Sequence, residues 1–102
     1  MAESALTEST YYILLSLYRP LHGYGIMQRT AELSGGRVRL AAGTLYGALN
    51  AMVDRGWIAL LPGEGRKKEY QLTPRGLEVL EKELARLREL VASGDMVMKE
   101  EA

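Results

Sequence analysis

The residues best suited to chemistry are a run of cations and a polar helical stripe, both in the middle of the chain. Arg66, Lys67 and Lys68 follow a turn-forming cluster of proline and glycine at residues 62–65. Upstream, Gly43, Tyr46, Gly47 and Asn50 fall on one side of a helical pattern. Long cations contact phosphates, and an asparagine amide can both donate to and accept from a base edge. The chemistry that these residue types favour is recognition of a nucleic acid.

The distribution of charge along the chain supports nucleic-acid recognition more than the net charge does. The 102 residues carry a formal net charge of zero, with a pI near 6.6. Residues 36–75, however, hold seven basic and three acidic residues, whereas both ends of the chain are acidic. Affinity for nucleic acid depends on the local charge that faces phosphates, so a neutral sum does not exclude it.

Other kinds of site are poorly supported by the sequence. The chain has no cysteine and a single histidine, His22, so neither a metal site nor a thiol nucleophile is expected. No catalytic constellation or cofactor motif is present, and we expect neither enzymatic activity nor a cofactor. No apolar run is long enough to cross a bilayer, and no signal peptide is visible. These features predict a cytoplasmic protein with no membrane partner.

Apolar spacing, caps and breakers predict the elements that position these residues. Helices are expected over residues 7–18, 24–33 and 42–55, the first with Thr7 as its N-cap. Residues 21–23 are expected to form a turn, and residues 37–40 a short edge strand at most. Glycines at 35, 36 and 56 are expected to end the second and third helices.

A β-hairpin and a last helix complete the predicted order. Residues 57–61 and 66–72 read as its two strands. Thr73 as N-cap and Pro74 at the first helical position open the last helix, which Ser93 and Gly94 are expected to end. This helix carries apolar residues at coiled-coil spacing, which favours pairing of two subunits: Leu77, Leu80, Leu84, Leu87 and Val91.

The predicted fold class is mostly α with a small β-hairpin, namely a winged helix-turn-helix followed by a dimerisation helix. We expect one compact unit, in which residues 1–73 form the DNA-binding part and residues 74–102 the dimerisation helix and tail. In a winged helix the third helix enters the major groove and the hairpin lies beside it, so the expected partners are double-stranded DNA and a second copy of the chain.

Four ordered motifs resemble the PadR family of transcriptional regulators. They are HGYG at 22–25, GTLY at 43–46, GWI at 56–58 and GRKKEYQLTPRG at 65–76. The chain resembles the shorter members, which have a single C-terminal helix. The resemblance implies a homodimeric, ligand-responsive repressor. The sequence departs from the family pattern at two positions. Gly47 stands where the family commonly has a proline, and Ala41 stands where it often has a serine as the N-cap of the third helix.

The expected site has two parts. The predicted DNA contacts are Tyr24, Arg37, Gly43, Thr44, Tyr46, Asn50, Arg66, Lys67 and Lys68. The predicted dimer contacts are Tyr11 and the five apolar residues of the last helix. Tyr11, Tyr12, Tyr18 and Tyr24 either line a cleft for a small aromatic effector or pack in the core.

Two alternative functions use the same elements. One is a winged-helix module that binds protein without affinity for DNA, which the neutral total charge would suit. The other is a small-molecule sensor whose aromatic cleft at the dimer axis is the main feature.

Overall fold

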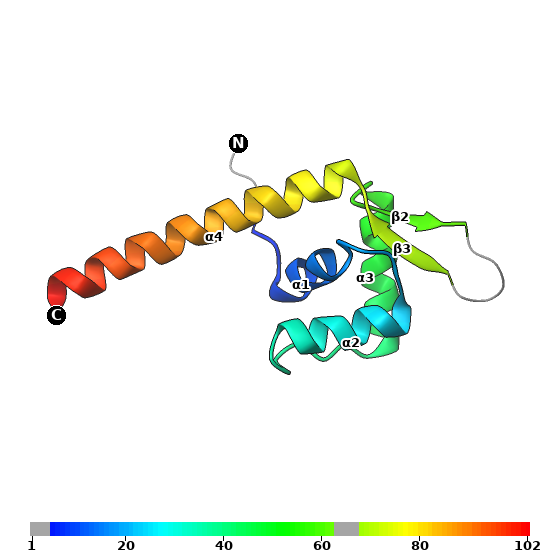
Figure 1. The fold of residues 1–102 in the computed structure, drawn as a ribbon, viewed down its shortest axis with the longest axis horizontal. Coiled ribbons are helices and arrows are strands. Elements are labelled where there is room, and N and C mark those ends of the chain that lie inside the picture. Colours follow the sequence, from blue (N-terminus) through cyan, green and yellow to red (C-terminus); the bar gives the residue numbers. More distant parts are fainter. Residues whose placement is uncertain (1–4, 63–67) are drawn as a thin grey trace.

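A computed structural model describes residues 5–62 and 68–102 of the chain. Its elements follow the order α1 (Glu8–Ser16), β1 (Leu21–His22), α2 (Gly23–Leu33), α3 (Ala42–Asp54), β2 (Ile58–Leu61), β3 (Glu69–Leu72) and α4 (Pro74–Glu101). Figure 1 shows α1, α2 and α3 gathered beside the hairpin, with α4 leaving this body as a long rod. The predicted order of three helices, hairpin and helix is confirmed.

The caps predicted from the sequence set the helix boundaries. The Thr7 hydroxyl accepts from the Thr10 N–H at 3.1 Å, and the Thr73 hydroxyl accepts from the Gly76 N–H at 3.0 Å. Each cap satisfies one donor that a first helical turn would otherwise leave without a partner. Gly35 and Gly56 have φ of 63° and 77°, a conformation that stops a helix and that glycine adopts at little cost.

One buried cluster joins the helices to the sheet. Its fully buried members come from α1 and its C-cap, α2, α3 and β2, and include Ile13, Leu14, Leu17, Ile26, Leu45, Leu49 and Ile58. Leu80 of α4 belongs to the same cluster, with 4% of its surface exposed. The first half of α4 is therefore part of the body, and this contact fixes the direction in which the rest of the helix runs.

The sheet has three strands in the order β1-β3-β2, all antiparallel. The turn predicted at residues 21–23 is wrong in its first two residues, because Leu21 pairs with Tyr70 and His22 with Glu69. Two residues are too short for an alternating pattern to be seen in a sequence. The possible edge strand at residues 37–40 does not form, since β1 takes the edge beside β3. Val38 is instead buried and donates its N–H to the Ser34 hydroxyl at 2.9 Å.

The predicted end of the last helix at Ser93 and Gly94 is also wrong. Helix α4 continues through both residues to Glu101, and Gly94 does not have a positive φ. A helical glycine costs only about 1 kcal/mol relative to alanine, so one is tolerated between good helix formers. The extra turns place the C-terminal half of α4 far from the other elements (Figure 1).

Candidate nucleic-acid interface

Helix α3 presents one uncovered face made of small and polar residues. Leu45, Leu49 and Met52 on its inner side are buried in the core. On the other side, the side chains of Thr44 and Asn50 are exposed. A Cβ built at Gly43 or at Gly47 would have no atom within 4 Å, so this face is open along two turns. A bare helical face of this kind can enter a groove about 12 Å wide.

The N-terminal end of α3 lacks a side-chain cap. Ala41 occupies the N-cap position in an extended conformation, and the first turn holds no acidic residue. The first backbone N–H groups of a helix carry a partial positive charge and favour anions. At this end of α3, the N-cap side chain therefore accepts no hydrogen bond from the first backbone N–H groups, and no acidic residue of the first turn is there to accept one.

Tyr46 fixes how α2 and α3 meet. A Cβ at Gly23 would collide with the Tyr46 hydroxyl, so the phenol ring lies directly against the start of α2. Tyr46 is nonetheless 46% exposed. The pKa of Tyr70 in β3 is raised, first because burial disfavours the charged phenolate and second because Tyr46 lies nearby. Tyr46 thus joins α2, α3 and the sheet while keeping one edge open to solvent.

Of the three cations predicted for the hairpin, the structure describes Lys68. Lys68 is exposed and directly precedes β3. Arg66 and Lys67 lie outside the described residues.

The two secondary contacts predicted from sequence lie apart from each other. Tyr24 is 60% exposed at the start of α2, where its hydroxyl accepts from the Gln28 amide at 3.4 Å. Arg37 follows the other end of α2 and forms an ion pair of 2.8 Å with Glu8. Helix α2 has 11 residues and spans about 16 Å, so only Tyr24 lies near Tyr46 and the sheet.

The residues predicted for dimerisation differ in how far they are buried within one subunit. Leu80 is committed to the core of its own subunit, and Tyr11, Leu77, Leu84 and Leu87 are partly buried. Val91 is 62% exposed. The helical row that starts with the buried residues Gly76, Leu80 and Glu83 continues, at spacings of three and four, through Leu87, Leu90, Gly94 and Val97. Leu90 and Val97 were not predicted: the predicted apolar row took the neighbouring Val91 in place of Leu90, and Val97 lies beyond the helix end that was expected at Gly94.

Glu83 was also missed, although it is the one buried carboxylate among the described residues. It accepts from the Leu6 N–H at 3.1 Å and from two Arg86 nitrogens at 2.6 and 2.8 Å. The hydrogen bonds from Arg86 lower the pKa of Glu83, with burial acting in the opposite direction. The sequence showed only a charged residue on a helix, and its burial depends on the N-terminal segment that covers it.

The four tyrosines do not line one common cleft. Tyr11 and Tyr12 pack edge to face at 5.4 Å and border a hollow that Leu6, Glu83 and Leu87 complete. Tyr18 borders a separate hollow between α1 and α2, and Tyr24 is largely exposed. Across residues 5–62 and 68–102, no group of acidic or histidine residues is arranged to hold a metal ion. In the same part of the chain, no helix has the length and apolar character needed to cross a membrane.

Comparison with protein families gives one match that covers most of the chain. Residues 13–82 match the profile of the transcriptional regulator PadR-like family. An uncharacterized 37.1 kDa protein in transposon TN4556 of Streptomyces fradiae is 42% identical over 64 residues, which are 63% of this chain. The chain spans only 18% of that protein's length.

Solved structures show the same fold. A PadR family transcription regulator from Clostridium difficile superposes with a TM-score of 0.75 at 23% identity, over 90% of this chain and 99% of that one. Bacillus subtilis PadR in complex with operator DNA gives a TM-score of 0.63 at 30% identity, over 74% of this chain and 45% of that one. The winged helix with a C-terminal helix, predicted from the sequence, is confirmed as the fold.

Proposed function

The chain belongs to the PadR-like family of transcriptional regulators, and from this premise we propose that it binds double-stranded DNA as a homodimer. In this proposal the body up to residue 73 reads the duplex and α4 pairs two subunits. The observation that carries it is the open face of α3, where Gly43 and Gly47 leave the helix backbone free to approach a groove.

The base contacts are assigned to α3. Asn50 is exposed on the open face, one turn beyond Gly47, and its amide is suited to adenine. Thr44 and Tyr46 flank it. With few long donors on this face, specificity would rest largely on the shape of the duplex and on the spacing of two half-sites.

The phosphate contacts are assigned to the hairpin and to two helix N-termini. Lys68, which is exposed directly before β3, supplies one cation, and Arg66 and Lys67 are assigned to the phosphates from the sequence alone. The uncapped start of α3 supplies backbone donors, and Tyr24 adds a hydroxyl at the start of α2. We leave Arg37 out of the central contacts, because Glu8 already pairs with it.

Pairing of two subunits is assigned to the uncovered half of α4. Leu90, Val91 and Val97 are each more than half exposed within one subunit, and an apolar face of this kind is normally covered by a partner. Two subunits would present two copies of α3 to a duplex, which a palindromic operator requires. Leu80 is left out, since it packs within its own subunit.

A ligand-responsive repressor is the form of regulation that the family resemblance favours. The hollow bordered by Tyr11, Tyr12 and Leu87 supports a place for a small aromatic effector, since it lies between α1 and the part of α4 where pairing would begin. An effector there could change the angle between the two subunits.

A mobility-shift titration tests DNA binding. The full chain is titrated onto the duplex upstream of its own coding region at two salt concentrations. Binding should weaken steeply with salt, and Lys68→Ala should lower the logarithmic salt slope by about one. If no salt-sensitive shift is seen, the chain does not bind DNA, and the alternative of a protein-interaction module is favoured. If the salt slope of Lys68→Ala equals that of the parent chain, Lys68 does not contact a phosphate.

A further inference from the structure

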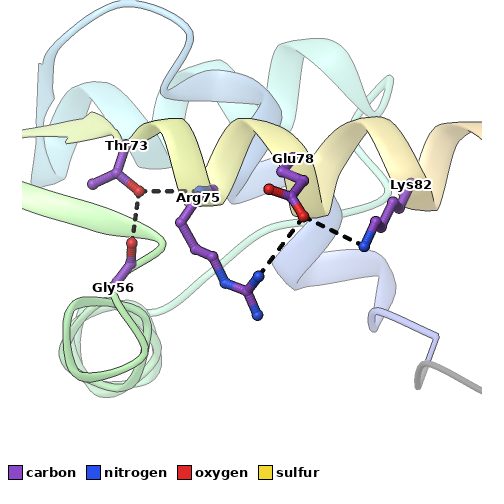
Figure 2. A network of polar contacts seen from close by, with 6 residues as sticks. Gly56, Thr73, Arg75, Glu78 and Lys82 are labelled. Atoms are coloured by element: carbon purple, nitrogen blue, oxygen red, sulfur yellow. Dashed lines mark hydrogen bonds and ion pairs between the residues drawn. The ribbon is translucent and has the colours of Figure 1, made fainter. Parts of the chain in front are cut away.

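The start of α4 is fastened to the end of α3 through Thr73. Its hydroxyl donates to the Gly56 carbonyl at 2.6 Å (Figure 2), lies 3.0 Å from the Trp57 carbonyl and accepts from the Gly76 N–H at 3.0 Å. Its backbone N–H donates to the Trp57 carbonyl at 3.0 Å. Gly56 and Trp57 form the turn that ends α3, since their N–H groups donate to carbonyls of its last residues. One side chain therefore connects the end of α3 to the first turn of α4.

Gly76 brings the same two segments into close contact. A Cβ at this position would overlap the Trp57 carbonyl, so a glycine lets the first turn of α4 lie directly on the turn that ends α3. The contacts of Thr73 and Gly76 with this turn form one joint between the two helices.

Beyond the joint, the end of α3 and the flank of α4 separate. A cleft of about 290 Å³ opens between them, bordered by Trp57 on one side and by Glu78 on the other. Figure 2 shows that the ion pairs of Glu78, with Arg75 at 3.8 Å and with Lys82 at 3.4 Å, run along α4. The joint, and not these two ion pairs, connects α4 to α3.

Two points fix the direction of a rigid rod, and the joint is one of them. The other is Leu80, which is buried in the core. Gly76 lies about 6 Å before Leu80 along the helix axis, and Gly94 about 21 Å beyond it. A displacement of about 1 Å at Gly76 would therefore move Gly94 by about 3.5 Å the other way. This is about the 3.4 Å rise of one base pair, so the rod in Figure 1 amplifies a small change at the joint.

We propose that Thr73 is a positioning residue, which sets the distance between the two copies of α3 in the dimer and thereby the half-site spacing that the protein prefers. The inference rests on the proposed homodimer, in which α4 pairs the subunits and α3 enters the groove. Each subunit contributes one joint, so a change at Thr73 acts twice. Spacing matters for this protein because the open face of α3 carries few long donors for base edges.

The first measurement needs no DNA. The chain has no cysteine, so Ala51→Cys on the exposed side of α3 gives one nitroxide label in each subunit. Double electron–electron resonance then measures the distance between the two labels of a dimer. In Thr73→Asp the carboxylate still caps α4, but it has no hydrogen to donate and is repelled by the Gly56 carbonyl. We expect the distance to shift or broaden by about 3 Å or more.

Two matched variants control for the substitution itself. Thr73→Ser keeps both hydrogen bonds of the hydroxyl and should retain the parent distance. Thr7→Asp also replaces a capping hydroxyl by a carboxylate, but at the start of α1, and should leave the distance unchanged. Gly76→Ala tests the joint by a second route, because its Cβ would push α4 away from the Trp57 carbonyl. Thermal unfolding checks that each variant folds.

The second measurement is a competition among duplexes that carry the preferred half-site twice, at spacings that differ by single base pairs. The parent chain and Thr73→Ser should prefer one spacing over its neighbours by about tenfold. Thr73→Asp should prefer another spacing or lose the preference. Affinity for a single half-site should be the same in all three chains, because the proposed DNA contacts do not include Thr73.

The outcomes separate this inference from the function on which it rests. A dimer with the same label distance in the parent chain, Thr73→Asp and Gly76→Ala would overturn the joint alone. A changed distance with an unchanged spacing preference would overturn the link between Thr73 and half-site choice. A monomeric parent chain would overturn the homodimer and the joint together.

Discussion

Helices α3 and α4 each leave one face uncovered, but the two faces differ in chemistry. The open face of α3 is made of glycine, threonine and asparagine, next to an uncapped helix end. The open face of α4 is made of leucine and valine, with Leu90 at 54% exposure and Val97 at 51%. Both belong to one subunit, and both are held in place by the same core.

The difference shows what each face can bind. An uncovered polar face costs little in water and leaves room for base edges and phosphates. An uncovered apolar face is unfavourable in water and is relieved by burial, at about 25 cal/mol for each Å². We therefore assign the face of α3 to DNA and the face of α4 to a second copy of the chain.

Charges on the apolar face of α4 should have the largest effect. In Leu90→Asp with Val97→Asp, two carboxylates would have to be buried between subunits, so we expect a monomer by sedimentation. Duplex affinity should fall about a hundredfold or more, because the second half-site is lost. Ala92→Asp with Met96→Asp places the same charges on the opposite side of the helix and should remain dimeric. A dimeric Leu90→Asp/Val97→Asp chain would refute the assignment.

Removing the Asn50 amide from the open face of α3 should change the affinity for DNA and leave the stability of the fold unchanged. Asn50→Ala should reduce affinity for the preferred duplex by about 1–3 kcal/mol and relax the base preference at one position of each half-site. The melting temperature should hardly change, because Asn50 is exposed. Fluorescence anisotropy with single-base variants of the duplex measures both effects. Equal loss on every duplex would show that Asn50 does not read a base.

Glu83 lies where α4 passes from its covered half to its open half. Protonation of Glu83 should lower the stability of the fold. The pKa of Glu83 is lower in the folded chain than in the unfolded chain, where it is about 4.3. The ionised carboxylate therefore stabilises the fold above that pH, and this stabilisation is lost as the pH falls through the folded pKa. Glu83→Gln should destabilise the neutral protein by about 1–3 kcal/mol.

The same substitution should flatten the fall in melting temperature on acidification below about pH 5. Differential scanning calorimetry from neutral to acidic pH measures this. Parallel curves for the parent chain and Glu83→Gln would mean that the Arg86 and Leu6 contacts do not control the titration. Glu89→Gln, on an exposed turn of the same helix, is the control.

A cap at the start of α3 should give the smallest effect. Ala41→Ser supplies the missing acceptor, and we expect stabilisation by about 1 kcal/mol or less, seen as a higher melting temperature. Because the hydroxyl would occupy donors that we assign to a phosphate, duplex affinity should not rise with stability. A parallel gain in affinity would contradict the role of the uncapped end.

The sequence predicted those parts of the fold that depend on local signals. Thr7, Thr73 and the glycines at 35 and 56 are local caps and stops, and each acts as expected. Strand β1 was not predicted, because two residues become a strand only through pairing with Tyr70 and Glu69. The end of α4 was misplaced at Gly94, because a glycine signals a helix end only when it adopts a positive φ.

The candidate site was predicted unevenly for the same reason. The open face of α3 follows from helical spacing, so Gly43, Gly47 and Asn50 could be assigned from the sequence. The contact of Tyr46 with Gly23, the pairing of Arg37 with Glu8 and the burial of Glu83 link residues far apart in the chain. Such contacts need the three-dimensional structure.

Amide hydrogen exchange of the full chain, with and without the duplex upstream of its coding region, shows which elements DNA covers. If α3 enters the groove, DNA should slow exchange at the start of α3 and in strands β2 and β3, while α4 is already protected in the free dimer. Protection by DNA confined to α1 and to the far end of α2, with α3 unchanged, would contradict it.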